Sequence, residues 1–239
     1  MVDNFKLIRE KLVFPNERSF YFIQILKRNK DNPEQKAYSR PIESFYVRSL
    51  EHFDRYMPHI IEKCRQNNAR AYIKMNPLDM LKVGMRTNII INQALAKEDW
   101  WSVISALNSA CGQGGVAEKE EDMEGNNTYR EGDVHVKGFQ KLWLLDLDDI
   151  SDNDEENKQF RDEVRDCVNS LEPLRNKKTK EPILNKVMME IPTKNGYHFL
   201  TTSFDMKEFR KKYTTQSHPI EGMKVVDCHK EGNTILYIP

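Results

Sequence analysis

The stretch LWLLDLDDI, residues 142–150, decides how the second half of this chain is interpreted. Four apolar residues lead directly into Asp146, Asp148 and Asp149. Because side chains alternate between the two faces of a strand, Asp146 and Asp148 are predicted to point the same way, about 7 Å apart. Two carboxylates that close repel each other unless a cation such as Mg²⁺ or Mn²⁺ neutralises them. The alternative is a polar strand end, at which Asp149 and Ser151 begin a turn.

Two further strands predicted on either side of a short helix also carry polar side chains. GYHFLTTSF (196–204) contains His198 and follows KVMMEIP (186–192) through the turn TKNG, whose Asn-Gly pair favours a hairpin. MKVVDCH (223–229) places Asp227 near the end of a third apolar strand. His198 and Asp227 each have a purely structural interpretation when taken singly. If the three strands share one sheet face, however, they gather the residue types used in two-metal phosphoryl chemistry.

The order of these motifs resembles the archaeo-eukaryotic primase superfamily, which includes the primase-polymerase domains of phages and plasmids. LLDLDD (144–149) is similar to the first motif of that family. IPTKNGYHFL (191–200) is similar to the turn and strand that carry its histidine, with Gly196 where many relatives have serine. VVDCHKEGNTILYIP (225–239) resembles its third motif.

The resemblance implies a DNA-directed nucleotidyltransferase that makes a primer or a DNA or RNA strand on a single-stranded DNA template. Asp146, Asp148 and Asp227 would hold two Mg²⁺ or Mn²⁺ ions, which align a 3′-hydroxyl with the α-phosphate of a nucleoside triphosphate. A separate helicase or replication protein would be a partner. The residues that the resemblance implies for nucleotide contact are His198, Lys194, Asn195 and Gly196.

The hydrophobic pattern predicts an α+β protein in two units. An N-terminal αβ unit is expected over 1–111, an acidic, glycine-containing linker over 112–138, and a second unit over 139–239. The predicted β-α-β-β-α-β-β order of the second unit is close to the split βαβ plan of RNA-recognition-like sheets with antiparallel or mixed strands.

Within the first unit the pattern is that of two strands and three helices. We expect at least one of the adjacent residues Trp100 and Trp101 in the core, and a break or kink at Pro58. The expected strands are 19–28 and 69–76, and the expected helices are 41–68, 77–97 (opened by Pro77) and 98–112.

A template-binding groove is predicted on the strand ARAYIKMN (69–76). Arg70, Tyr72 and Lys74 alternate onto one face of this strand, where cations and an aromatic ring suit a single-stranded nucleic acid. The basic stem KRNK (27–30) adds positive charge. The alternative is a solvated sheet edge.

Composition places the chain among soluble proteins. It is 38% hydrophobic and 31% charged, and no apolar run approaches the ~20 residues of a membrane span. Its four cysteines form no CxxC pair, which is typical of a reducing compartment, so we expect a cytoplasmic protein (in the host cytoplasm if phage-encoded) without a membrane partner. The net charge of zero argues against tight, purely electrostatic binding to nucleic acid.

Three other functions remain open from the sequence. A non-catalytic nucleic-acid-binding or interaction module could use the same sheet, with the acids as structural residues. A metal-dependent phosphohydrolase of the haloacid-dehalogenase type also has an Asp-x-Asp strand, although it needs further βα units after it. A metal-dependent nuclease could use the same carboxylates.

Overall fold

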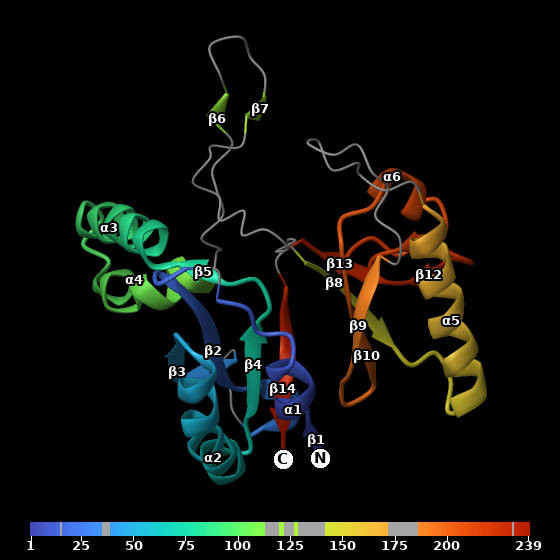
Figure 1. Cartoon of the computed structure of the whole chain (residues 1–239), viewed down its shortest axis with the longest axis horizontal. Helices are drawn as coiled ribbons and strands as arrows, with labels where there is room; N and C mark the ends of the chain where they lie inside the picture. Colours follow the sequence, from blue (N-terminus) through green and yellow to red (C-terminus); the bar gives the residue numbers. More distant parts are fainter. Residues whose placement is uncertain are drawn as a thin grey trace.

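The chain folds as a mixed α+β protein with two main antiparallel sheets (Figure 1). The computed structural model describes residues 1–14, 16–34, 39–112, 120–121, 127–128, 142–171, 186–230 and 232–239. Most of the linker predicted at 112–138 lies outside these ranges; the described part includes a short hairpin of β6 (Glu120–Glu121) and β7 (Asn127–Thr128). No helix in the described ranges has the length and apolar character needed to cross a membrane.

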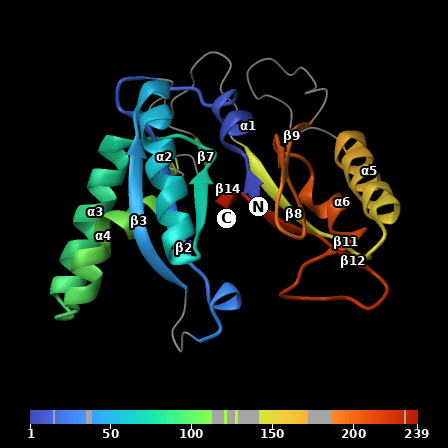
Figure 2. The same ribbon diagram turned by 90° about the horizontal axis from the view of Figure 1, so that it is seen from below.

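The first sheet has the strand order β1-β14-β4-β2-β3, with β5 also paired to β2. Helices α1 and α2 pack on one of its faces, and the α3–α4 hairpin packs on the other (Figures 1 and 2). A 3-10 turn, η1 (Asn29–Asp31), follows β2. The bounds are β1 Val2–Asp3, α1 Phe5–Arg9, β2 Ser19–Lys27, β3 Arg40–Val47, α2 Leu50–Asn67, β4 Arg70–Lys74, β5 Leu78–Asp79, α3 Met80–Leu95, α4 Trp100–Gly112 and β14 Asn233–Ile238.

The second sheet has the strand order β13-β8-β10-β9, and all its pairs are antiparallel. One face packs on α5 and α6 through an apolar core that includes Leu145, Leu147 and Phe160. A two-stranded parallel pair, β11 and β12, lies beside it. The bounds are β8 Trp143–Asp148, α5 Asp154–Ser170, β9 Val187–Pro192, β10 Gly196–Thr201, α6 Met206–Phe209, β11 Tyr213–Thr214, β12 Lys224–Val225 and β13 Asp227–His229.

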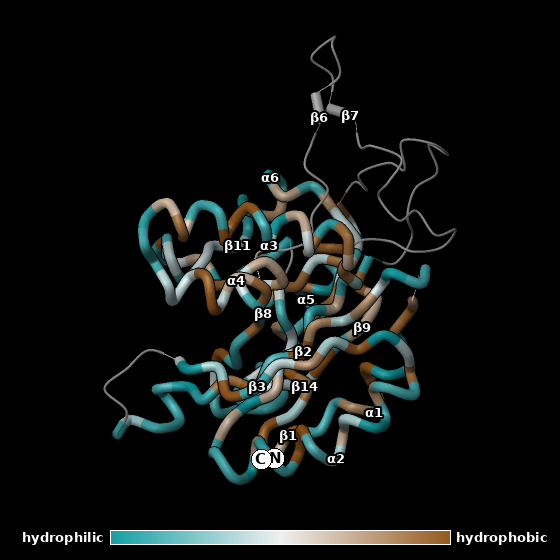
Figure 3. The backbone as a smooth tube through the Cα atoms, turned by 90° about the vertical axis from the view of Figure 1, so that its left-hand side faces the viewer, coloured by the Kyte–Doolittle hydropathy of each residue, from teal (hydrophilic) through white to brown (hydrophobic). Residues whose placement is uncertain are grey.

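The last strand differs from the expected plan, because β14 leaves the second half and enters the first sheet between β4 and β1. Its residues from Thr234 to Ile238 are all buried, so both faces of this apolar strand need cover. Residues of the second sheet, such as Leu144 and Leu200, also join the core that underlies the first sheet. The two halves therefore share a core. Strands β9 and β14 are in contact, and Figure 3, coloured by hydropathy, shows apolar residues along both.

Two predicted helices in the first half begin later than the sequence pattern indicated. Residues 40–47 form β3, and α2 begins only after Ser49, whose hydroxyl accepts a hydrogen bond from the backbone N–H of His52. Pro58 lies inside α2, which continues to Asn67. The helix expected to open at Pro77 begins at Met80, because the Asp79 side chain caps it. The predicted strands at 19–28 and 69–76 are confirmed. The expectation that Trp100 or Trp101 lies in the core is wrong, because both side chains are exposed.

Candidate active site between the two sheets

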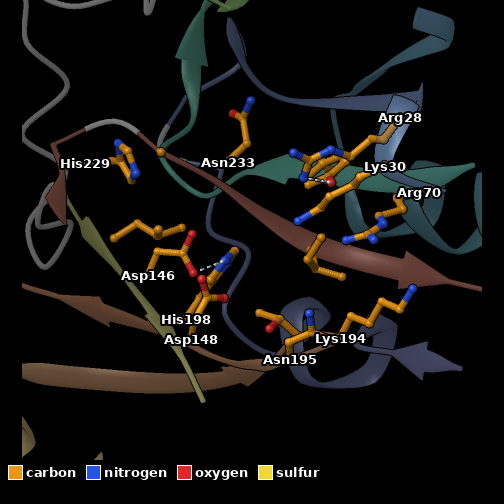
Figure 4. Close-up of a pocket in the computed structure, with 15 residues that line it drawn as sticks. Arg28, Lys30, Arg70, Asp146, Asp148, Lys194, Asn195, His198, His229 and Asn233 are labelled. Carbon is orange, nitrogen blue, oxygen red and sulfur yellow. Dashed lines mark hydrogen bonds and ion pairs between the residues drawn. The ribbon is translucent and has the colours of Figure 1, made fainter. Parts of the chain in front are cut away.

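The acidic face of β8 is set by simple strand alternation. Leu145 and Leu147 point into the core beneath α5, so Asp146 and Asp148 point to the opposite, open face. This face is turned toward the first sheet (Figure 4). The prediction that the two carboxylates share a face is therefore confirmed.

Strand pairing brings the other predicted residues to the same face. In the ladder, His198 of β10 lies opposite Asp146, and Asp227 of β13 lies opposite Asp146 on the other side. Gly196 lies opposite Asp148. The three strands thus meet around Asp146, as the motif order predicts.

His198 is held firmly between the two sheets. Its Nε2 lies 3.3 Å from Oδ1 of Asp146, and its Nδ1 lies 2.9 Å from the hydroxyl oxygen of Thr234 on β14. His198 is only 7% exposed and Thr234 is fully buried. The crossing of β14 into the first sheet therefore supplies the second contact that orients this ring.

The two carboxylates on β8 differ in their protonation behaviour. Burial acts to raise the pKa of Asp146, but the hydrogen bond and charge of His198, with smaller effects of His229 and Lys30, bring it below the usual value. Burial, followed by the negative charge of Asp146, raises the pKa of Asp148 above the usual value. Asp148 therefore carries negative charge that the surrounding side chains compensate only in part.

Gln216, in the segment between β11 and β12, contacts two of the carboxylates. Its side-chain Nε2 donates to Oδ2 of Asp148 at 3.1 Å, and its backbone N–H donates to Oδ1 of Asp227 with an N···O distance of 3.3 Å. In the described part of the chain, no three acidic, histidine or cysteine side chains converge as a ready metal site. Gln216 thus donates to carboxylate oxygens of Asp148 and Asp227 that a metal ion would need as ligands. Sequence reasoning missed Gln216, because its exposed segment has no periodic pattern.

A cavity of about 260 Å³ separates the carboxylates from a wall of positive charge. Figure 4 shows Asp146, Asp148 and His198 facing this space from the second sheet, with cationic side chains on its other sides. The charge of Lys30, on the 3-10 turn, acts to lower the pKa of both Asp146 and Asp148, although at Asp148 burial and the charge of Asp146 outweigh it. The four cationic residues that line the cavity are Arg28, Lys30, Arg70 and Lys194.

The cations are held in place to different degrees. Arg70 donates through Nε to Asp31 at 2.6 Å, and Lys194 Nζ lies 3.5 Å from the same carboxyl group. Arg28 donates to the hydroxyl of Tyr72 at 3.0 Å. A second cavity of about 480 Å³ shares Lys30, Arg70 and Lys194 with the first, so the basic wall continues beyond the carboxylates.

The predicted template-binding strand is only partly exposed to this cavity. Arg70 and Tyr72 line it, as expected from their alternation. Lys74 does not, which corrects the prediction: it is 1% exposed and donates to the carbonyl oxygens of Cys111 and Gly112. Lys74 instead stabilises the C-terminal end of α4, where backbone carbonyls favour a cation.

The turn before β10 places two of the predicted residues, Lys194 and Asn195, in the lining of the cavity, whereas Gly196 does not line it. The backbone N–H of Asp149 donates to the carbonyl of Asn195, and that of Thr193 donates to the carbonyl of Gly196. Gly196 has a φ of 142°, and a Cβ there would lie 2.1 Å from the carbonyl oxygen of Leu147. Only glycine fits this position, so its presence has a local steric reason.

Sequence reasoning missed several residues that line the cavity, among them the polar residues His229 and Asn233. His229 lies two positions after Asp227 on β13, so alternation would have placed it on the same face. Asn233 begins β14, whose path into the first sheet the pattern did not reveal.

Comparison with known proteins finds no matching family model, no similar curated protein and no similar solved structure. The functional assignment therefore depends on the fold and on this site.

Proposed function

We propose that this protein is a metal-dependent nucleotidyltransferase of the primase-polymerase type. The observation that carries the proposal is the cavity itself, in which Asp146, Asp148 and His198 face a cationic wall across about 260 Å³. Carboxylates on one side suit divalent metals, and cations on the other suit the phosphates of a nucleoside triphosphate.

The strand order of the second sheet supports this assignment. Its elements run β8-α5-β9-β10-α6-β13 and its spatial order is β13-β8-β10-β9, which corresponds to the split βαβ plan of RNA-recognition-like domains. In this proposal Asp146 and Asp148 lie on the first strand of that plan, His198 on the third and Asp227 on the fourth. The antiparallel sheet also argues against a phosphohydrolase of the haloacid-dehalogenase type, because that alternative needs successive βα units.

The donor set fits Mg²⁺ or Mn²⁺ in chemistry, because Asp146, Asp148 and Asp227 offer carboxylate oxygens and the charge of Asp148 is incompletely compensated. A metal bound by these residues would neutralise the charge on the α-phosphate and lower the pKa of an attacking 3′-hydroxyl. For Asp148 and Asp227 to hold it, the Gln216 contacts would have to be released.

The protein's own residues would bind and orient the reactants. His198, whose Nδ1 is fixed by Thr234, would contact a phosphate oxygen through Nε2, which would have to exchange its contact with Asp146 for the phosphate. Lys194 and Lys30 would hold the triphosphate tail. The 3′-oxygen would form a new bond to the α-phosphorus and the bond to the β-phosphate's bridging oxygen would break. Pyrophosphate leaves and the hydroxyl proton passes to water.

The partners follow from this chemistry. The substrates would be nucleoside triphosphates and a single-stranded DNA template, for which Arg70 and Tyr72 line part of the groove. A separate helicase or replication protein of a phage or plasmid would supply the unwound strand, in the cytoplasm of the cell.

A primer-extension assay on single-stranded DNA with Mg²⁺ or Mn²⁺ tests the proposal. Wild-type protein should incorporate labelled nucleotides only when metal is present, and His198→Ala should incorporate far less while remaining folded. Absence of incorporation from every primer and template, with either metal and with ribo- or deoxyribonucleotides, would contradict it.

A second candidate is a non-catalytic module that binds single-stranded nucleic acid. It is favoured by the Gln216 contacts, which satisfy Asp148 and Asp227 without a metal. This candidate predicts metal-independent binding of single strands that Asp146→Ala leaves unchanged.

Substitution of Lys30 by alanine is expected to weaken the binding of a nucleoside triphosphate about tenfold, because one charge-assisted contact to phosphate is lost. The binding of a nucleoside monophosphate should change much less. Lys27→Ala is the matched control. It also removes one positive charge near the end of β2, but Lys27 does not line the cavity. Equal effects of the two substitutions, measured by calorimetry, would place the triphosphate elsewhere.

A further inference from the structure

The imidazole of His198 has a different partner at each of its two ring nitrogens. Its Nε2 lies 3.3 Å from Oδ1 of Asp146, which lines the cavity (Figure 4), and its Nδ1 lies 2.9 Å from the hydroxyl oxygen of Thr234. A neutral imidazole has one N–H donor and one lone-pair acceptor, and the hydrogen bonds around the ring select which nitrogen carries the hydrogen. These two contacts therefore decide which nitrogen of His198 can donate to a substrate.

Thr234 itself does not line the cavity. Its neighbours along β14, Asn233 and Ile235, both line the cavity, and strand alternation turns the Thr234 side chain to the other face of the strand. Its backbone is held by pairing with Ile73 in the β4–β14 ladder. Thr234 can therefore influence a molecule in the cavity only through His198.

The Thr234 hydroxyl is best satisfied as a donor to the ring. Among the residues that the structure describes, Nδ1 of His198 is its single hydrogen-bond partner. If the hydroxyl only accepted a hydrogen bond from Nδ1, its own hydrogen would be buried without an acceptor, which buried polar groups rarely tolerate. The hydroxyl therefore donates to Nδ1, and Nδ1 carries the lone pair.

The contact with Asp146 requires the same arrangement. The hydrogen bond and charge of His198 bring the pKa of Asp146 below its usual value, so this carboxylate is ionised at neutral pH and can only accept. With the hydrogen on Nδ1, the lone pair of Nε2 would face the carboxylate. A doubly protonated ring would satisfy Asp146 but would leave the Thr234 hydrogen unpaired. Only the neutral ring with its hydrogen on Nε2 satisfies both partners.

Of these two contacts, the one with Thr234 is the one that persists in the proposed reaction. Asp146 would then bind a metal ion and give up its contact with Nε2. Thr234 lies on the far side of the ring from the carboxylates, in a paired strand, and nothing in the reaction displaces it. It would keep the ring in place while Nε2 changes its partner.

We infer that Thr234 is a positioning residue that holds His198 as the neutral tautomer with its hydrogen on Nε2. The use of this hydrogen rests on the proposed function, in which Nε2–H passes from Asp146 to a phosphate oxygen of the nucleoside triphosphate. A ring nitrogen that carries hydrogen has no lone pair for a metal ion. His198 therefore contacts phosphate and leaves the metal to the carboxylates.

Nitrogen-15 NMR of the histidine rings tests the tautomer without nucleotide or metal, at about two pH units above the ordinary histidine pKa of about 6.5. The chain has six histidines, and the signals of His198 are those missing from His198→Ala. The wild type should carry hydrogen on Nε2 and a lone pair on Nδ1. Asp146→Ala should keep this single tautomer, because Thr234 remains.

Variants of Thr234 isolate its hydroxyl. Asp146→Ala/Thr234→Val keeps the shape of the side chain but removes the hydroxyl, and should show a mixture of both tautomers. Asp146→Ala/Thr234→Ser should restore the single tautomer. Hydrogen on Nδ1 or a charged ring in the wild type would overturn the inference, as would one unchanged tautomer in the valine variant.

Calorimetry with Mn²⁺ and a nonhydrolysable nucleoside triphosphate gives the functional consequence. Thr234→Val should weaken nucleotide binding about tenfold, the equivalent of one hydrogen bond, and Thr234→Ser should bind as the wild type does. Thr201→Val is the matched control, because Thr201 is also fully buried but its hydroxyl has no hydrogen-bond partner among the described residues. It should leave binding unchanged. If no protein binds the nucleotide, the proposed function is contradicted, and the NMR result still decides the inference.

Discussion

Substitution of Asp148 by asparagine is expected to reduce metal-dependent nucleotide incorporation by at least about a hundredfold. The carboxylate is one of two on the open face of β8, and asparagine keeps its size while it removes the charge that a divalent metal needs. In the absence of metal, the same substitution should raise the midpoint of thermal unfolding, because it removes the repulsion between Asp148 and Asp146.

The stabilising part of this effect depends on pH. Burial and the charge of Asp146 raise the pKa of Asp148 in the folded protein, so the folded state binds this proton more tightly than the unfolded chain. The ionised carboxylate therefore destabilises the fold at neutral pH. This penalty declines as the pH falls through the raised pKa of the folded state and is absent below the ordinary carboxyl pKa of about 4. The advantage of Asp148→Asn over wild type should disappear over the same range.

Two matched variants separate function from stability. Asp146→Asn should also abolish incorporation but should destabilise the fold at neutral pH, because the pKa of Asp146 is lowered by its contact with His198. Asp149→Asn should change neither incorporation nor stability strongly. Asp149 lies outside the cavity, and its Oδ1 is 3.9 Å from Nη1 of Arg161 on α5. Wild-type incorporation by Asp148→Asn would show that β8 holds no catalytic metal.

Substitution of Gly196 by alanine is expected to destabilise the fold by more than about 3 kcal/mol. A side chain at φ 142° is strained, and the new Cβ would lie 2.1 Å from the carbonyl oxygen of Leu147, a backbone atom that cannot move away alone. The β8–β10 pairing would have to open next to Asp148. Urea unfolding followed by circular dichroism measures the loss.

Gly84→Ala is the control for this experiment. Gly84 lies in the interior of α3, and nothing lies within 4 Å of a Cβ added there. Alanine should therefore stabilise the helix by about 0.5–1 kcal/mol. A Gly196→Ala protein as stable as wild type would mean that the turn before β10 is not packed against β8 as described.

The part of the site that the sequence predicted follows from strand alternation. The period of two places Asp146 and Asp148 on one face whatever the rest of the fold, and apolar residues flanking His198 and Asp227 identify their strands. Alternation does not give the register, however. That His198 and Asp227 both lie opposite Asp146 is a property of the assembled sheet.

The cationic wall could not be derived in the same way, because it depends on how two sheets pack against each other. Lys30 lies more than a hundred residues before Asp146, on a 3-10 turn with no periodic pattern. It faces the carboxylates only because β14 crosses to the first sheet and brings the halves together. Gln216 was missed for a similar reason, since it lies in a turn after the short strand β11, where no periodic pattern indicates which way a side chain points.

The misassigned helix at 41–68 has a local explanation. Phe45, Leu50 and Phe53 happen to lie at helical spacing across the boundary between β3 and α2. Phe45 and Val47 are buried alternately, which is a strand pattern, and Ser49 provides the cap at which the helix begins. The cap is a stronger signal than the spacing of apolar residues over a short window.

The most direct test of the central claim is a calorimetric titration of Mn²⁺ and a nonhydrolysable nucleoside triphosphate into the wild type and into Asp146→Ala/Asp148→Ala. We expect the wild type to bind the nucleotide only when Mn²⁺ is present. The double variant should be folded but should bind neither Mn²⁺ nor the nucleotide. Equal nucleotide binding by both proteins, or none by the wild type, would contradict a metal-dependent nucleotide site between the two sheets.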